Sequence, residues 1–110
     1  MNNILSCLII GEGGFEMVAV SKKIDIYQEA TSTEQYFYLH NGIPLKSLAE
    51  LIDQLVNMDE ELFRYHVNEK NNDFANWLRD VFGFKELARR MKMSRSAQGM
   101  LKTITRYLES

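Results

Sequence analysis

The stretch Ser47–Val56, with the sequence SLAELIDQLV, decides the fold class of this chain. Its apolar residues recur at the i, i+3, i+4, i+7 and i+8 spacing that places side chains along one face of an α-helix. These residues are Leu48, Leu51, Ile52, Leu55 and Val56. Ser47 and Glu50 form a capping box, in which a hydroxyl and a carboxylate each accept a backbone N–H that the first helical turn leaves without a partner. The pattern therefore predicts a helix from Leu48 onward, with one face buried in a core.

On the C-terminal side of this stretch the sequence predicts further helices. Asn57 is expected to cap the second, whose acidic first turn suits the positive end of the helix dipole. The polar segment 68–72 is expected to be a loop, and Asn72 or Asp73 to cap the third helix. Gly83 stands where a glycine in the left-handed conformation often ends a helix.

Two more helices are predicted, one over 84–91 and one after a cap at Ser94 or Ser96. The last helix has an apolar stripe, which serves either as core or as a contact face for a partner: Ala97, Met100, Leu101, Ile104 and Leu108. The residues predicted to form the core are Leu48, Leu51, Ile52, Leu55, Phe63, Val67, Phe74, Trp77, Leu78, Val81 and Leu87.

On the N-terminal side, Asn41-Gly42 joins two short apolar runs. The pair predicts a β-hairpin with a type I′ turn, because both central residues of that turn need positive φ. Pro44 has no N–H, so the returning strand should be short or at a sheet edge. Partial alternation of apolar residues over 18–27 predicts a short strand, and 28–35 is expected to be a loop.

The predicted fold is a mainly α, small helical bundle of about five helices with a short N-terminal β-hairpin. Residues 17–35 are expected to be irregular or to hold the short strand, and 36–93 to form the helical domain. Residues 94–110 are expected to form a C-terminal basic amphipathic helix. Residues 1–16 are interpreted as an over-extended start, because Gly11–Gly14 back-translates into a purine-rich stretch of the kind that binds ribosomes, just before Met17.

Composition narrows the function classes. A chain of 110 residues with 45% hydrophobic and 25% charged residues has the size and composition of one ordinary domain, which excludes a two-domain enzyme. Cys7 is the one cysteine, so the chain cannot form an internal disulfide or a thiolate metal cluster. A reducing cytoplasm is the expected location. No apolar run is long enough to predict a membrane span.

Charge is unevenly distributed along the chain. Residues 1–80 carry six Lys or Arg and thirteen Asp or Glu, a net charge of −7, whereas residues 81–110 carry seven and two, a net charge of +5. A basic segment can attract nucleic acid or an acidic protein. It can equally pair with the acidic part of the same chain or of a second copy.

Five segments carry a resemblance to a known family: FYLHNG at 37–42, LKSLAEL at 45–51, FRYHVN at 63–68, NDFANW at 72–77 and ELA at 86–88. Together they resemble a family of small bacterial and archaeal domains of unknown function, and the strongest element is Asn-Asp-Phe-Ala-x-Trp after an upstream His. The resemblance covers about half of the chain. It implies a compact helical domain and a prokaryotic source, and it implies no activity.

His66, Asn72, Asp73 and Trp77 are the residues from which a catalytic site could be built. An imidazole beside a carboxylate can act as an oriented general base. The alternative is structural, with His66 packed beside Trp77 and bonded to the Asn72–Asp73 helix cap. The chain offers no partnered nucleophile or phosphate loop, and His40, His66 and Cys7 lack metal-ligand spacing, so we expect no enzyme, metal, cofactor or small-molecule substrate.

Residues 86–102 resemble a helix-turn-helix. Arg95, Gln98 and Lys102 would face a DNA groove. Met93 occupies one of the apolar positions of this motif, which fits the resemblance. Lys92 does not fit, because it stands where the turn of the motif usually has Gly. The candidate contacts to nucleic acid or to a partner are Arg89, Arg90, Lys92, Arg95, Gln98, Lys102 and Arg106.

Taken together, these patterns predict a non-catalytic cytoplasmic module for protein interaction or regulation. Its partner would be an unknown protein or a second copy, as in a dimer. DNA binding through 86–102 is the alternative.

Overall fold

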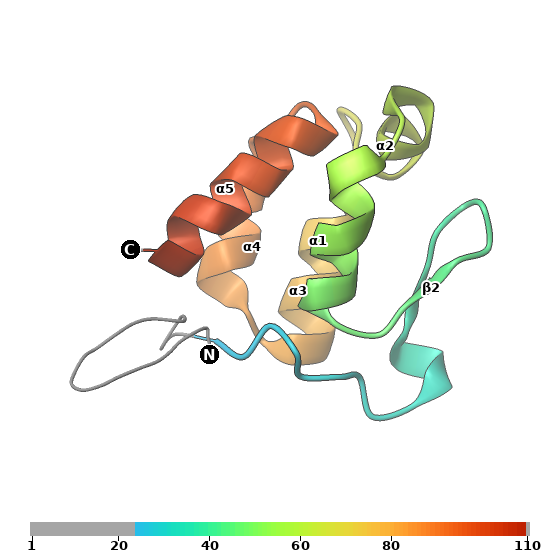
Figure 1. Ribbon diagram of the computed structural model, residues 1–110, viewed down its shortest axis with the longest axis vertical. Coiled ribbons are helices and arrows are strands. Elements are labelled where there is room, and N and C mark those ends of the chain that lie inside the picture. The colour runs from blue at the N-terminus through green and yellow to red at the C-terminus, as the bar shows by residue number, and fades with distance from the viewer. Residues whose placement is uncertain (1–23, 110) are drawn as a thin grey trace. The chain divides into compact units, whose positions relative to one another are not determined.

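The computed structural model describes residues 24–109 (Figure 1). Residues Ile26–Ile104 form one compact unit, and the described residues of the other unit are 24–25 and the end of the last helix from Thr105. Five α-helices, a 3-10 helix and a two-stranded antiparallel hairpin make up the described chain, which confirms the predicted mainly α fold with a hairpin on the N-terminal side.

The hairpin pairs β1 (Phe37–Tyr38) with β2 (Pro44–Leu45), so that Phe37 lies opposite Leu45. Its turn differs from the predicted type I′. The N–H of Gly42 donates to the carbonyl of Leu39 at 2.7 Å, and the N–H of Leu39 donates to the carbonyl of Ile43 at 2.9 Å. The loop thus has three residues, and only its last position, Gly42 with φ 95°, uses the left-handed freedom of glycine.

The segment before the hairpin runs along β2 and the start of the first helix. Glu29 forms an isolated bridge with Ser47, and the N–H of Ala30 donates to the carbonyl of Lys46 at 2.8 Å. The 3-10 helix η2 (Thr33–Gln35) occupies part of the expected loop. Residues 24–27 contain a turn in place of the predicted strand, and the rest of that prediction, like the proposed start at Met17, lies outside the described residues.

Helix α1 (Leu48–Asn57) begins at the predicted capping box. Ser47 Oγ accepts the N–H of Glu50 at 3.3 Å, and Glu50 Oε1 accepts the N–H of Lys46 at 2.9 Å. The carboxylate therefore reaches one residue beyond the cap. Leu48, Leu51 and Leu55 are buried as predicted.

Helix α2 (Glu60–His66) begins two residues later than expected. Its cap is Asp59, whose Oδ1 accepts the N–H of Leu62 at 2.8 Å. The prediction of Asn57 as the cap was wrong because α1 extends through that residue.

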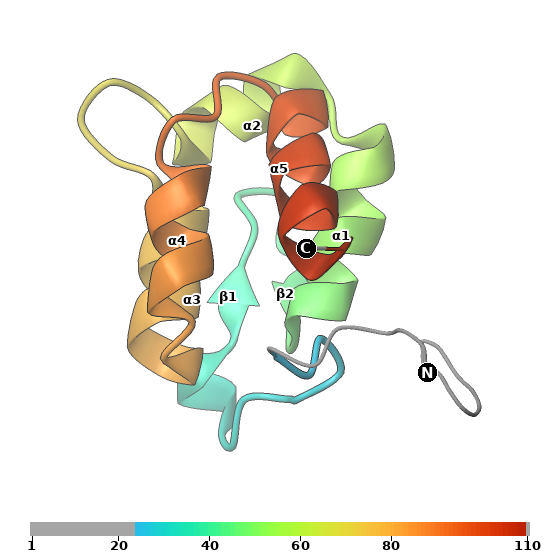
Figure 2. The ribbon, with the colours of Figure 1, turned by 90° about the vertical axis from the view of Figure 1, so that its left-hand side faces the viewer.

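Helices α3 (Asp73–Phe82) and α4 (Lys85–Met91) form a helical hairpin, and Figure 2 shows them side by side. Asn72 caps α3 through Oδ1, which accepts the N–H of Ala75 at 3.0 Å, and its Nδ2 donates to the carbonyl of Met91 at the far end of α4, also at 3.0 Å. Gly83 ends α3 with φ 73°, which confirms the predicted left-handed cap.

Helix α5 (Ala97–Glu109) is capped by Ser96, whose Oγ accepts the N–H of Gly99 at 3.0 Å. Ala97, Met100 and Ile104 are buried. The stripe on this helix therefore contributes to the core, and the compact unit continues past the expected division at residue 93 to Ile104.

The core differs from the predicted set at its edges. Ile52 and Val81 are only half-buried, and Val56 is exposed. The buried side chains also include five that the prediction of the core omitted: Leu39, Leu45, Met91, Met100 and Ile104. None of the helices in the described part of the chain combines the length and the apolar character needed to cross a membrane.

Candidate functional site

His66 joins three separate parts of the fold. It is the last residue of α2, and its side chain is buried. Nε2 accepts the backbone N–H of His40, in the hairpin loop, at 3.0 Å. Nδ1 lies 3.2 Å from Oδ2 of Asp73, the first residue of α3. The imidazole therefore ties the hairpin to the ends of two helices.

These two hydrogen bonds define the tautomer of His66. A backbone N–H can only donate, so Nε2 must be the acceptor, and the ring proton is on Nδ1, where it faces the carboxylate of Asp73. In an oriented general base, the nitrogen opposite the carboxylate is free to take a proton from a substrate. In His66 a backbone amide occupies that nitrogen.

Asn72 and Trp77 belong to the same network but bond elsewhere. Trp77 Nε1 donates to the carbonyl of Gln35 at 2.8 Å, which ties α3 to η2. The prediction placed His66 beside Trp77. In the structure both rings contact Phe37, at centroid distances of 5.0 Å for His66 and 5.7 Å for Trp77. Phe37 was not predicted as part of this cluster, because a two-residue strand carries no pattern that marks its inward side.

We expect His66→Phe to destabilise the protein by about 1–3 kcal/mol, because the N–H of His40 then loses its acceptor in a part-buried setting. Chemical denaturation of the variant measures this loss. His40→Ala is the matched control, since it retains the backbone N–H and removes only the exposed ring stacked on Tyr65, and it should cost less than about 1 kcal/mol. Equal losses in both variants would mean that the hydrogen bond to Nε2 contributes nothing.

The predicted contact residues lie on α4, on its connection to α5 and on α5, and we call those within the compact unit the basic face. All of its members are exposed: Arg89, Arg90, Lys92, Arg95, Gln98 and Lys102. Gln98 and Lys102 are four residues apart on α5 and so share one side of the helix. Arg106 is also exposed, but it lies beyond Ile104, in the part of α5 that is outside the compact unit.

Glu86 partly neutralises the basic face. Its carboxylate accepts hydrogen bonds from Nε of Arg89 at 3.3 Å and from Nε of Arg90 at 3.0 Å. The hydrogen bond from Arg89, followed by that from Arg90, lowers the pKa of Glu86 and keeps it ionised. These pairs are exposed to solvent and therefore contribute little to stability, but they reduce the charge that a partner meets at the two arginines.

Two features of the connection between α4 and α5 depart from the predicted helix-turn-helix. Met93 was expected at an apolar inward position, yet 74% of its surface is exposed. Lys92 adopts a right-handed helical conformation with φ −61°, where the turn of this motif usually has a glycine. Arg95 precedes α5 and lies in the connection.

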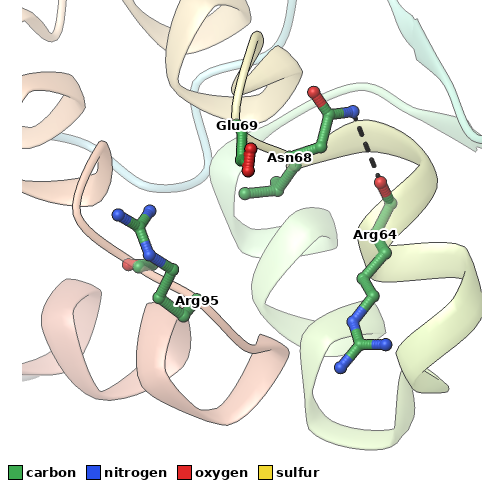
Figure 3. Close-up of a pocket in the computed structure, with 6 residues that line it drawn as sticks. Arg64, Asn68, Glu69 and Arg95 are labelled. Atoms are coloured by element: carbon green, nitrogen blue, oxygen red, sulfur yellow. Dashed lines mark hydrogen bonds between the residues drawn. The ribbon is translucent and has the colours of Figure 1, made fainter.

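A pocket that no sequence pattern indicated lies where the end of α2 meets this connection. Figure 3 shows Arg64 and Arg95 on opposite sides of it, with Glu69 between them and the two guanidinium groups pointing apart. Its lining residues are Arg64, Val67, Asn68, Glu69, Ser94 and Arg95. Ser94 is 6% exposed, and its Oγ has no hydrogen-bond partner among the described residues. A buried hydroxyl without a partner costs about 1–3 kcal/mol, so this atom marks the pocket as incomplete.

No group of three or more potential ligands for a metal ion occurs within residues 24–109. Comparison of the chain with family models, with curated proteins and with solved structures found no match. The resemblance to small domains of unknown function therefore stays a prediction.

Proposed function

We propose that this protein is a non-catalytic module that binds an acidic protein partner through the basic face. The observation that carries this proposal is the exposure of five cationic side chains along α4, its connection to α5 and the first turns of α5. Glu86 is the one carboxylate in residues 81–104. A surface of one sign attracts and orients a partner of the opposite sign.

The state of His66 supports a non-catalytic role. Both of its ring nitrogens are engaged by the fold, with the backbone at His40 and with Asp73. Chemistry at this imidazole would require the hairpin loop to detach first. The residues that resembled a catalytic cluster are thus better explained as structural ties: His66 with Asp73 holds the hairpin, Asn72 joins α3 to α4, and Trp77 joins α3 to η2.

DNA is the second candidate partner. Gln98 and Lys102 are both exposed on one side of α5, and Arg95 lies just before that helix, an arrangement that suits contacts with phosphates and base edges. The exposed Met93 and the conformation of Lys92 favour the protein partner, because both depart from the motif that would seat α5 in a major groove.

The test is a titration of the labelled protein with a glutamate-rich peptide and with a mixed-sequence DNA duplex at low and moderate salt. We expect the peptide to bind and Arg95→Glu with Lys102→Glu to weaken it by roughly tenfold or more. Lys46→Glu with Lys70→Glu is the matched control, because it makes the same change in net charge at residues outside α4, α5 and the connection between them. Glu86→Gln should strengthen binding, since it removes the negative charge that accepts hydrogen bonds from Arg89 and Arg90.

The outcomes separate the two candidates. Tighter binding of the duplex, with an affinity that falls steeply as salt rises, would replace the protein partner with DNA. Equal weakening by the control pair would mean that net charge alone drives binding, and this would overturn the basic face. Binding of neither probe at low salt would overturn both candidates.

A further inference from the structure

The pocket between the end of α2 and the α4–α5 connection has a volume of about 630 Å³ and is open to solvent. Two cationic side chains line it, Arg64 from α2 and Arg95 from the connection (Figure 3). Arg64 already has a counterion, because its Nη2 lies 3.0 Å from Oε2 of Glu60. Arg95 forms no ion pair among the described residues. The pocket therefore presents one guanidinium group whose charge the fold does not balance.

Hydrogen-bond donors accompany Arg95 at the start of α5. The first N–H groups of a helix have no acceptor within it. The Oγ of Ser96 accepts the N–H of Gly99 at 3.0 Å, and the carbonyl of Ser96 accepts the N–H of Met100 at 2.9 Å. The N–H groups of Ala97 and Gln98 remain available to a ligand. The positive end of the dipole of this 13-residue helix adds to the same charge.

Ser94 adds a further hydrogen-bond donor to this pocket. It lines the pocket and is more than nine-tenths buried, yet its Oγ has no partner among the described residues. A hydroxyl can donate to an anionic oxygen. Guanidinium, hydroxyl and helix N-terminus are the three groups with which proteins commonly hold phosphate.

We propose that this pocket binds a phosphate group, held by Arg95, Ser94 and the N-terminus of α5. Arg95 offers paired N–H groups that match two phosphate oxygens, and Ser94 Oγ gains the partner that it lacks. Glu69 on the same pocket opposes an anion and limits the affinity. The site shares Arg95 with the basic face of the proposed function, but phosphate at this position needs neither Lys102 nor the arginines of α4, so variants of Lys102 distinguish the two.

The phosphate belongs either to a free small molecule or to a phosphorylated serine of a partner. The test therefore uses inorganic phosphate, a phosphoserine peptide and its unphosphorylated form, each followed by backbone amide NMR of the full chain. We expect the amide signals of Ala97 and Gln98 to shift with phosphate and with the phosphopeptide, and not with the unphosphorylated peptide. Tighter binding of the phosphopeptide than of phosphate assigns the group to a partner, and equal affinity assigns it to a small molecule.

Four substitutions give this inference a distinct signature. Arg95→Gln should weaken binding by roughly tenfold or more, the effect of losing a charge-assisted hydrogen bond, whereas Lys102→Gln on the basic face should leave it within about twofold. Glu69→Gln should tighten it. Ser94→Ala should raise the melting temperature, because it removes an unsatisfied buried hydroxyl, and should weaken phosphate binding at the same time.

Failure of this inference is distinguishable from failure of the proposed function. Amide signals of α5 that do not respond to phosphate, or that respond equally in wild type and Arg95→Gln, would overturn the phosphate site. Neither result would affect binding of the glutamate-rich peptide through Lys102 and the α4 arginines. A loss of peptide binding with phosphate binding intact would overturn the proposed function alone.

Discussion

Trp77→Ala is expected to lower the free energy of unfolding by about 3–5 kcal/mol, the range for emptying a buried aromatic site. Trp77 is 7% exposed and contacts the rings of Phe37 and Phe82 at centroid distances of 5.7 and 5.2 Å. It also ties α3 to η2 through the carbonyl of Gln35. A change of this size should lower the melting temperature by at least ~12 °C in a domain of this length.

Trp77→Phe separates the two contributions of this side chain. It keeps an aromatic ring in the site but removes the N–H that bonds Gln35 and part of the indole volume, so we expect it to cost clearly less than the alanine variant. Chemical denaturation of both variants, followed by circular dichroism, makes the comparison. An unchanged transition in Trp77→Ala would contradict the placement of Trp77 in the core.

Met100→Lys is the second substitution with a large expected effect, more than about 4 kcal/mol. Truncation of a buried Met already costs about 2–5 kcal/mol, and an unpaired ammonium group taken out of water adds several more. Met100 is fully buried within the compact unit. Since small domains have only about 5–15 kcal/mol of stability in total, much of the variant should be unfolded.

Gln98→Lys is the matched control, two residues away on the same helix and exposed, and it should change stability by no more than about 0.5 kcal/mol. The comparison tests whether α5 is part of the domain or an addition to it. If Met100→Lys had the same melting temperature as the control, the packing of α5 would contribute nothing to the stability of the domain. The basic face would then be a feature of a separate helix.

The basic face and the phosphate pocket both depend on this packing. Arg95 and Ser94 lie in the short connection between α4 and α5, and the two helices hold that connection at both ends. Its near end is tied further by the bond from Asn72 to the carbonyl of Met91 at 3.0 Å. A variant that loosens α5 should therefore weaken binding at both sites.

Local features were predictable from the sequence to within a residue or two. The capping box at Ser47 and the glycine that ends α3 are both found where the pattern placed them. Such signals are reliable because a cap and a helical stripe involve residues only three or four positions apart. Asn57 shows the limit of this approach, since two residues that can both cap compete and the length of α1 decides between them.

The two sites differ in how far the sequence could indicate them. The basic face was predictable, because charged residues on short amphipathic helices are exposed wherever those helices pack. The pocket was not, because Arg64 and Ser94 are 30 positions apart and neither belongs to a motif. Sequence spacing holds no information about which loops meet.

The sequence by itself determined the helices, most of their caps, the place of the hairpin and the division of charge, because each of these follows from residues that are neighbours along the chain. The bond of His66 to Asp73 at the cap of α3 was predicted, but tertiary structure alone decided that His66 accepts the N–H of His40, 26 positions away, and that Trp77 donates to Gln35, 42 positions away. It also decided that Ile52 stays half-buried while Met100 is enclosed. The physical reason is that burial and long-range hydrogen bonding depend on which element covers a side chain, and that is settled only when all the helices pack together.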